Sequence, residues 1–346
     1  MKLHHHKNES TLQQSSLQSH HEFDGHNEPY RSAKRIIRHV LDSKTHFQLA
    51  ALLHLALSER GWPIDTANQL HLAAGFIPTL TVSTPALVNI AKQLLAGAID
   101  AVYISNLPEG KDKIALFQLA FTHLIGKPFN YASQNDGMLV MELRPAANAG
   151  ANTNATTTDF EIHTDDAAMP RDARTEFIVL GGVVNPPGTL TGYASTIDAI
   201  ADMTEHDLYV LGQKRFQVRF PTSFGLGDNN WSPPISLLTG SGDNTELRFP
   251  SYATRAIDPE DTEAATAIVA LKAALNRNVV DFPVDPGTML VFNNTRGAHR
   301  RGAIGEGDRL VLRTYAARSF SLLRQRSGVD GPIFPINPFI PNNDFY

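Results

Sequence analysis

The chain contains no cysteine among its 346 residues. Disulfides, thiolate zinc sites, iron–sulfur clusters and cysteine nucleophiles are therefore excluded, and any metal must be bound by histidine and carboxylate side chains. An excess of charge is also lacking, since the formal net charge is only −5 and lysine and arginine are scattered along the chain. Because the chain has no clustered basic residues, binding to nucleic acid or to an acidic membrane is not predicted, and a small molecule is the expected partner.

Long hydrophobic runs are absent as well. The longest apolar stretch, near residues 49–57, is far shorter than the roughly 20 residues that a membrane-spanning helix needs. Residues 1–29 are rich in His, Ser, Gln, Asn and Glu, with too few apolar side chains for a secretion signal. We therefore expect a cytoplasmic protein with a disordered His-rich arm over 1–29, because this segment buries too little surface to offset its ordering entropy.

The remaining chain has a globular composition, with 42% hydrophobic and 19% charged residues. Apolar residues recur at helical spacing over 32–60, with a break near Ser43 that predicts two helices. Two further helices are predicted at 85–98 and 111–124, and a short strand at 101–105 lies between them. The part of the chain from 30 to 128 is therefore expected to be mainly helical.

After Pro128 the pattern changes to short runs rich in Val, Ile, Phe, Thr and Tyr, separated by Gly, Pro, Asn and Asp. Strands are predicted at residues 138–143, 160–163, 176–184, 191–195, 215–219, 246–249, 279–284, 288–293 and 310–316, and helices only at 205–211 and 260–275. Many strands at short spacing are typical of an antiparallel sandwich or jelly roll. We expect an α+β chain with a mainly β core over 129–320 and a C-terminal tail over 321–346.

One pair of side chains is suited to metal binding. Side chains alternate along a strand, so His163 and Asp165 point to the same side at the end of the strand predicted at 160–163 and can share one ion. Alone the pair is weak evidence, because a His-x-Asp or His-x-Glu pair is expected about once by chance in such a chain, and two more lie in residues 1–29. An isolated pair of this kind is more often a solvated pair at a strand end.

A second group of candidate residues lies near the C-terminus. A Pro-Gly turn leads into the apolar run 288–293, and the next turn leads to His299. In the strand that follows, Arg309 and Arg313 share one face. Two arginines on one face of an otherwise apolar strand predict a bound anion, and an internal ion pair of Arg313 with a carboxylate such as Asp308 is the alternative.

Together these residues resemble the clavaminate synthase and taurine dioxygenase branch of the Fe(II)/2-oxoglutarate oxygenases. The pattern of that family is His-x-Asp/Glu, a long interval, a distal His, and an Arg in the next strand. The resemblance covers about residues 128–318. It implies a double-stranded β-helix, or jelly-roll, core with the iron at one mouth, in a single oxygenase domain over 30–346.

The resemblance also implies residue roles: Fe(II) bound by His163, Asp165 and His299, and the co-substrate 2-oxoglutarate anchored by Arg313. Two imidazoles and one carboxylate occupy one face of an octahedral ion and leave three positions for a bidentate 2-oxo acid and O2. A guanidinium donates two parallel hydrogen bonds to the far carboxylate in fork geometry. Arg309 lies roughly 13 Å from Arg313 along the strand at ~3.3 Å per residue, so it is assigned a supporting place beside the cofactor or on the substrate side.

Four further residues complete the predicted site. Thr191 lies in a stretch, Leu-Thr-Gly-Tyr-Ala-Ser, that is similar to the family segment whose Thr hydroxyl meets 2-oxoglutarate; an ordinary β-forming residue is the alternative. Gln134 lies in residues 130–140, which resemble the strand entry before the metal motif of the amino-acid hydroxylases, and the resemblance implies contact with the substrate. A plain polar residue at a strand end is the alternative. Asp166 and Arg301, which adjoin the metal ligands, are further candidates for contact with the substrate.

The implied reaction is oxidative decarboxylation of 2-oxoglutarate to succinate and CO2, coupled to hydroxylation of an unactivated C–H bond in a free amino acid or similar small polar metabolite. Two alternatives stay open: the same iron site with desaturation or cyclisation, and a jelly-roll binding protein without turnover. Halogenation is disfavoured because Asp165 fills the position that chloride needs. Family members that take a cationic side chain carry acidic residues in the stretch before the late helix. Residues 247–252 here contain no carboxylate, so the resemblance disfavours a cationic substrate side chain.

Two polar loops, over 166–174 and 222–244, are predicted lids by their length and position. The sequence leaves open whether the protein forms a homo-oligomer.

Overall fold

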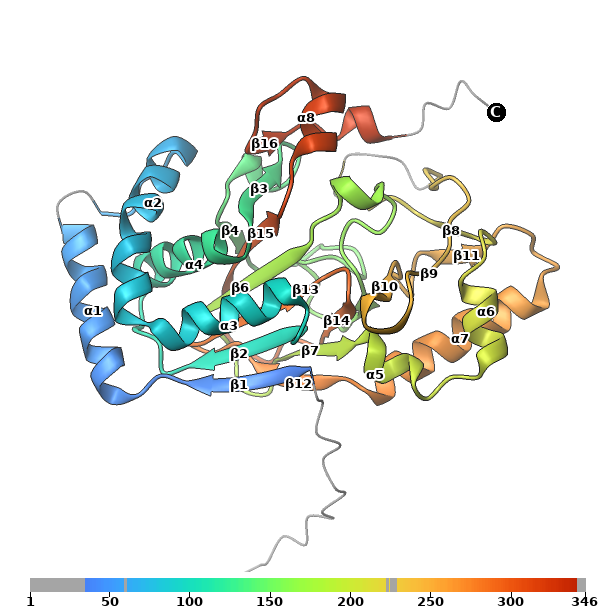
Figure 1. Ribbon diagram of the computed structural model, residues 1–346, viewed down its shortest axis with the longest axis horizontal. Helices are drawn as coiled ribbons and strands as arrows, with labels where there is room; N and C mark the ends of the chain where they lie inside the picture. The colour runs from blue at the N-terminus through green and yellow to red at the C-terminus, as the bar shows by residue number, and fades with distance from the viewer. Residues whose placement is uncertain (1–34, 59–60, 222–223, 225–228, 341–346) are drawn as a thin grey trace, which may run out of the picture. The chain divides into compact units, whose positions relative to one another are not determined.

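The computed structural model describes residues 35–58, 61–221, 224 and 229–340 (Figure 1). All of them belong to the second of two units, Ala33–Tyr346. The arm predicted to be disordered, residues 1–29, lies outside the described residues.

The N-terminal part of this unit combines helices with two parallel strands. Helices α1 (Ser43–Ser58), α3 (Pro85–Ala96) and α4 (Lys111–Ile125) lie close to the predicted ranges. Strand β2 (Ala101–Ser105) is also as predicted. Helix α2 (Thr66–Ser83) was not predicted; it begins at an Asp65 cap that accepts a hydrogen bond from the backbone of Asn68 and continues through Pro78.

The prediction of a helix in the first half of residues 32–60 is wrong. Residues Ile36–Val40 form strand β1, which pairs in parallel with β2 from Ile36 opposite Ala101 to Val40 opposite Ser105 (Figure 1). The run Ile-Ile-Arg-His-Val contains three β-branched residues, which fit a pleated surface. Pairing with a distant strand therefore outweighs the local helical spacing.

The main sheet has the strand order β1-β2-β13-β6-β15-β3-β16, and β4 pairs with β15 off this path. Its other strands are β3 (Lys127–Tyr131), β4 (Met141–Leu143), β6 (Phe177–Val184), β13 (Met289–Asn293), β15 (Leu310–Ala317) and β16 (Ile333–Phe334). Strand β16 and helix α8 (Ser321–Ser327) lie in the segment predicted as a tail. The described part of that segment, which ends at residue 340, thus contributes a strand to the main sheet.

A second sheet has the order β12-β7-β14-β5. Its strands are β5 (Phe160–His163), β7 (Leu190–Ser195), β12 (Val280–Pro283) and β14 (Gly297–Arg301). Strand β14 was expected to be a turn that delivers His299. Instead it lies between β7 and β5, with His299 opposite Tyr193 on one side and His163 on the other.

The main sheet is covered on both faces because alternate residues of its strands enter two hydrophobic clusters. On β13, Met289 and Val291 belong to the cluster that includes α1–α4, whereas Leu290 and Phe292 belong to the cluster that includes the second sheet. Gln118 of α4 fixes this helix to the sheet by donating to the carbonyl of Val179 and the hydroxyl of Thr314. The two sheets therefore face each other across one core.

The remaining elements lie beside the second sheet. They are α5 (Thr196–Ile200), α6 (Glu205–Leu211), α7 (Thr262–Arg277), the pair β8 (Phe216–Val218) and β11 (Thr254–Ala256), and the pair β9 (Leu238–Thr239) and β10 (Glu246–Leu247). Each strand predicted after residue 128 overlaps an observed strand, which confirms a mixed, strand-rich α/β fold. No single described helix is long and apolar enough to cross a membrane; α2 and α3 pass that test only together, and they are bent by 108°.

Candidate metal centre

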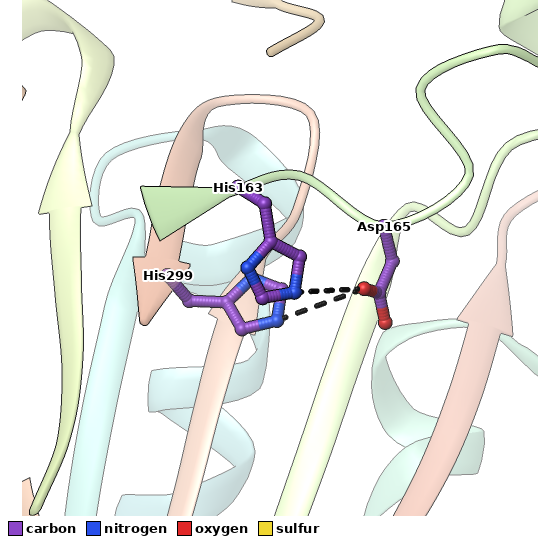
Figure 2. Close-up of side chains that lie close together, drawn as sticks. All are labelled: His163, Asp165 and His299. Atoms are coloured by element: carbon purple, nitrogen blue, oxygen red, sulfur yellow. Dashed lines mark ion pairs between the residues drawn. The ribbon is translucent and has the colours of Figure 1, made fainter. Parts of the chain in front are cut away.

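Three predicted side chains converge between the two sheets. His163 is the last residue of β5, His299 is its direct partner in β14, and Asp165 follows two residues after β5. The Oδ1 atom of Asp165 lies 3.3 Å from Nε2 of His163 and 3.8 Å from Nε2 of His299 (Figure 2). Their ligand atoms all lie within 4.8 Å of one another. The pairing of two strands that are far apart in sequence is what brings these residues together.

The protonation of His163 is set by the backbone. Its Nδ1 lies 2.7 Å from the carbonyl oxygen of Glu161, which can only accept a hydrogen bond, so the proton of the neutral ring is on Nδ1. Phe160 stacks on the ring with 3.9 Å between centroids. The lone pair of Nε2 therefore points toward Asp165, in the tautomer that binds a metal ion.

His299 is held as a neutral ring. Burial, together with nearby His163, lowers its pKa to about 3, so the ring carries no proton charge at neutral pH. Phe292 of the main sheet packs 4.8 Å from this ring, centroid to centroid. The imidazole of His299 is thus available as a ligand without first losing a proton.

The carboxylate of Asp165 is oriented from its far side. Its Oδ2 accepts a hydrogen bond of 2.6 Å from the hydroxyl of Tyr315 and lies 3.3 Å from Nη1 of Arg313. Burial alone would raise the pKa of Asp165, but the rings of His163 and His299 and the guanidinium of Arg313 beside the carboxylate hold it well below its usual range. Asp165 is therefore ionised, and Oδ1 is the oxygen left to face the two histidines.

This arrangement fits a metal ion. Adjacent ligands of an octahedral ion with bonds of about 2.1 Å lie about 3 Å apart, close to the distances from Oδ1 of Asp165 to the two rings. Among the described residues no other His, Asp or Glu joins this group of three. Two imidazoles and one carboxylate with open positions are the donor set of non-haem Fe(II) oxygenases.

Two cavities adjoin the three side chains. The larger, of about 370 Å³, is lined among others by Gln134, Asn154, Asp165 and Tyr252. The smaller, of about 40 Å³, is lined by both histidines and by the three residues predicted to bind 2-oxoglutarate, Thr191, Arg309 and Arg313. Asn154 and Phe160 line both cavities, so they form the wall between them.

Arg313 in β15 and Arg309, the residue before this strand, have different surroundings. Arg313 lies beside the metal centre, where its guanidinium contacts Asp165 at 3.3 Å, Asn154 at 3.2 Å and Gln134 at 3.3 Å. Arg309 is 4% exposed, and its Nε has no hydrogen-bond partner within the described ranges. Burial lowers the pKa of Arg309 to about 10, which leaves it charged at neutral pH. A buried guanidinium without a partner is a site prepared for an anion.

Two predicted substrate contacts are held by other groups. Asp166 lines the larger cavity, but its Oδ2 accepts a hydrogen bond from the hydroxyl of Thr175. Burial and the charge of Asp165 raise the pKa of Asp166 to about 7. Arg301 lines the smaller cavity, not the larger, and donates to the carbonyls of Thr156 at 2.6 Å and Gly302 at 2.9 Å. Of the predicted substrate contacts, Gln134 has the most direct position, since it lines the larger cavity beside Arg313.

The loop over 166–174, predicted to be a lid, is held in place by hydrogen bonds and an ion pair. Arg248 donates to the carbonyls of Ala167 and Met169, and Arg174 pairs with Glu246. The second predicted lid, over 222–244, lies partly outside the described residues. The sequence did not identify residues 150–154, which line the larger cavity; their Asn- and Thr-rich composition is the only feature that distinguishes them.

A group of two histidines and one aspartate between two sheets fits the class of iron-dependent oxygenases. Residues 73–315, more than half of the chain, match the model of the taurine catabolism dioxygenase TauD, TfdA family. The chain belongs to this family, which confirms the resemblance found in the sequence.

Solved structures of similar fold include an asparagine oxygenase in complex with Fe(II), 2S,3S-3-hydroxyasparagine and succinate, with a TM-score of 0.75, 20% identity, and coverage of 86% of this chain and 99% of that chain. The non-haem iron oxygenase OrfP in complex with Fe, succinate and (3R,4R)-dihydroxy-L-Arg has a TM-score of 0.73 and the same identity and coverage. OrfP with Fe and alpha-ketoglutaric acid has a TM-score of 0.71, again at 20% identity and with 86% and 99% coverage. At this identity the likeness is one of fold.

Proposed function

We propose that the protein is an Fe(II)- and 2-oxoglutarate-dependent oxygenase that hydroxylates an unactivated C–H bond of a free amino acid or a similar small polar metabolite. The observation that carries the proposal is the convergence of His163, Asp165 and His299 beside a small cavity that the buried Arg309 also lines. The Nε of Arg309 has no hydrogen-bond partner among the described residues. Membership of the TauD, TfdA family supports the reaction type. The hydroxylated amino acids bound to the asparagine oxygenase and OrfP support the substrate class.

The proposal includes the finer fold. The two facing sheets are proposed to form a double-stranded β-helix, or jelly roll, with the metal centre at one mouth. Residues 30–346 are proposed to act as one oxygenase domain, because strands from the beginning, middle and end of the described chain share the main sheet.

Iron held by these three side chains would supply the activation of O2 that couples decarboxylation of 2-oxoglutarate to oxidation of the substrate. The protein prepares the ligands in advance. The backbone of Glu161 fixes the tautomer of His163, burial keeps His299 neutral, and Tyr315 turns one oxygen of Asp165 away from the metal. Such preorganisation raises metal affinity without the cost of rearranging side chains on binding.

For 2-oxoglutarate the contacts favour a different division of roles from the one predicted. Arg313, the predicted anchor, touches the metal ligand Asp165, so it suits a carboxylate that lies close to the metal. Arg309 lies four residues before Arg313, directly ahead of β15, and lines the same small cavity as Thr191. We assign the far carboxylate of 2-oxoglutarate to Arg309, with the hydroxyl of Thr191 as a second donor.

The substrate is assigned to the larger cavity. Gln134 and Asn154 offer amide groups there, and both contact the guanidinium of Arg313. An amino acid needs a cation for its carboxylate and acceptors for its ammonium group, and these residues supply both beside Asp165. Phe160 and Tyr252 add an aromatic wall that excludes water from the reacting carbon.

The test is incubation of the protein with Fe(II), 2-oxoglutarate and each member of an amino-acid panel, with succinate as the measured product. We expect at least one amino acid to stimulate succinate formation and to gain the mass of one oxygen atom. A product that has instead lost two hydrogen atoms would indicate desaturation or cyclisation in place of hydroxylation. Absence of stimulated succinate formation with every member would contradict the proposal.

A further inference from the structure

Asn294 binds the backbone of the carboxylate ligand from both sides. This residue lies in the turn between β13 and β14, five residues before His299, and is 1% exposed. Its Oδ1 accepts a hydrogen bond of 2.8 Å from the N–H of Asp165, and its Nδ2 donates one of 3.0 Å to the carbonyl of Asp165. The same Nδ2 donates to the carbonyl of Thr175 at 2.9 Å. The oxygen and the NH2 group of the Asn294 side chain therefore both hydrogen-bond to backbone groups of Asp165, and the NH2 group also reaches Thr175.

The backbone at Asp165 depends on such a partner because it lies outside the sheet. Strand β5 ends at His163, and its pairing with β14 is irregular between His299 and Arg301. The following residue, Asp166, has a φ of 57°, in the left-handed region that non-glycine residues seldom adopt. The amide of Asn294 supplies the donor and the acceptor that a neighbouring strand would supply in a regular sheet.

Asn294 is itself held in a braced turn. Its own N–H donates to the carbonyl of Glu176 at 2.7 Å. The preceding residue, Asn293, receives a hydrogen bond from the hydroxyl of Tyr193 and donates from its backbone to the carbonyl of Asp100. Two residues later, Arg296 pairs with the side chain of Asp100, which is fully buried. The amide is thus a fixed point relative to the core.

We propose that Asn294 is a positioning residue for the metal centre: its amide sets the backbone of Asp165 so that the carboxylate meets the two histidines. The turn over 293–296 then places two of the three ligands, Asp165 through the amide of Asn294 and His299 through the strand that the turn begins. The inference rests on the metal centre of the proposed function. Residues that orient a metal ligand in this way commonly change metal affinity about 10- to 100-fold when they are removed.

The experiment compares Asn294→Ala and Asn294→Asp with the wild-type protein and with Gln69→Ala. Gln69 is the matched control, a fully buried amide in α2 whose Nε2 donates to the carbonyl of Pro63 at 2.8 Å. Dissociation constants for Co(II) alone are measured by calorimetry, and hydrogen exchange is followed in the peptide that contains Asp165. Thermal unfolding of each variant gives the stability that a purely structural role would change.

We expect Asn294→Ala to weaken Co(II) binding about 10- to 100-fold and to accelerate exchange at Asp165. Asn294→Asp keeps the acceptor for the N–H of Asp165 but loses both donors, so it should also weaken binding, and it serves if the alanine variant does not fold. Gln69→Ala should lower the unfolding temperature and leave Co(II) affinity unchanged.

Wild-type affinity in a folded Asn294 variant, with unchanged exchange at Asp165, would overturn the inference while leaving the proposed function intact. Equal losses of affinity in the Asn294 and Gln69 variants would also overturn it, because the effect would then follow stability alone. If the wild-type protein binds no Co(II), the metal centre itself is contradicted, and the role of Asn294 is overturned with it.

Discussion

The hydroxyl of Tyr315 donates a hydrogen bond of 2.6 Å to Oδ2 of Asp165, while Oδ1 of the same carboxylate faces His163 and His299. Tyr315 is 1% exposed and lies on the same face of β15 as Arg313, whose guanidinium packs 4.5 Å from the centre of the tyrosine ring. One strand of the main sheet therefore fixes which oxygen of the carboxylate is presented to a metal.

Tyr315→Phe tests this orientation. The phenyl ring preserves packing against Arg313, but the carboxylate loses one of the two groups that hold Oδ2. We expect metal affinity to fall about 10- to 100-fold, since a hydrogen bond to a charged group contributes about 1.5–3 kcal/mol. Calorimetric titration with Co(II) measures the change. Tyr103→Phe is the control, because the Tyr103 hydroxyl donates to the carbonyl of Pro283 away from the site; equal effects of the two variants would speak against a role in the metal centre.

Arg309→Met tests the assignment of the far carboxylate of 2-oxoglutarate. The variant removes a buried charge-assisted fork without touching a metal ligand, so we expect 2-oxoglutarate to bind about 10- to 100-fold more weakly with Co(II) affinity unchanged. Arg309→Lys keeps the charge but not the two-pronged donor geometry, so its affinity for 2-oxoglutarate should lie between those of the wild-type protein and Arg309→Met.

Arg313→Met is the comparison for that prediction. Because Arg313 contacts Asp165, this variant should change metal affinity as well as ligand binding. If instead Arg313→Met alone weakens 2-oxoglutarate binding and Arg309→Met has no effect, Arg313 is the anchor, as the sequence predicted.

Gly182→Ala tests the packing of the main sheet. A Cβ atom at Gly182 would lie 2.0 Å from the backbone oxygen of Asp285, which cannot move without displacing the turn before β13. We expect the free energy of unfolding to fall by about 3 kcal/mol or more, measured by urea denaturation. Gly75→Ala in α2, where nothing lies within 4 Å of the added atom, should instead be neutral or stabilising by up to about 1 kcal/mol. Similar losses in both variants would contradict the packing described.

Strand periodicity was enough to predict which candidate side chains share a side of a strand. The two-residue spacing of His163 and Asp165 predicts a shared side, and the four-residue spacing of Arg309 and Arg313 predicts a shared face. Tyr315 is two residues from Arg313, so the same spacing also predicts that Tyr315 lies on that face, although the residue was not identified from the sequence.

Other features depend on contacts that a local pattern does not contain. Residues 36–40 have helical spacing, yet they form β1 because β2 offers an unpaired edge. The role of Asn294 depends on a loop 129 residues away in sequence. The division of labour between Arg309 and Arg313 depends on which guanidinium already has partners, and strand parity cannot distinguish them.

Binding of 2-oxoglutarate to the Fe(II)-loaded protein without oxygen tests the central claim most directly. A 2-oxo acid chelated to Fe(II) absorbs visible light, so titration with 2-oxoglutarate should produce a new absorption band in the wild-type protein. The band should be lost in His163→Ala and in His299→Ala. A wild-type protein without the band, or variants that keep it at full intensity, would contradict a metal centre built from these side chains.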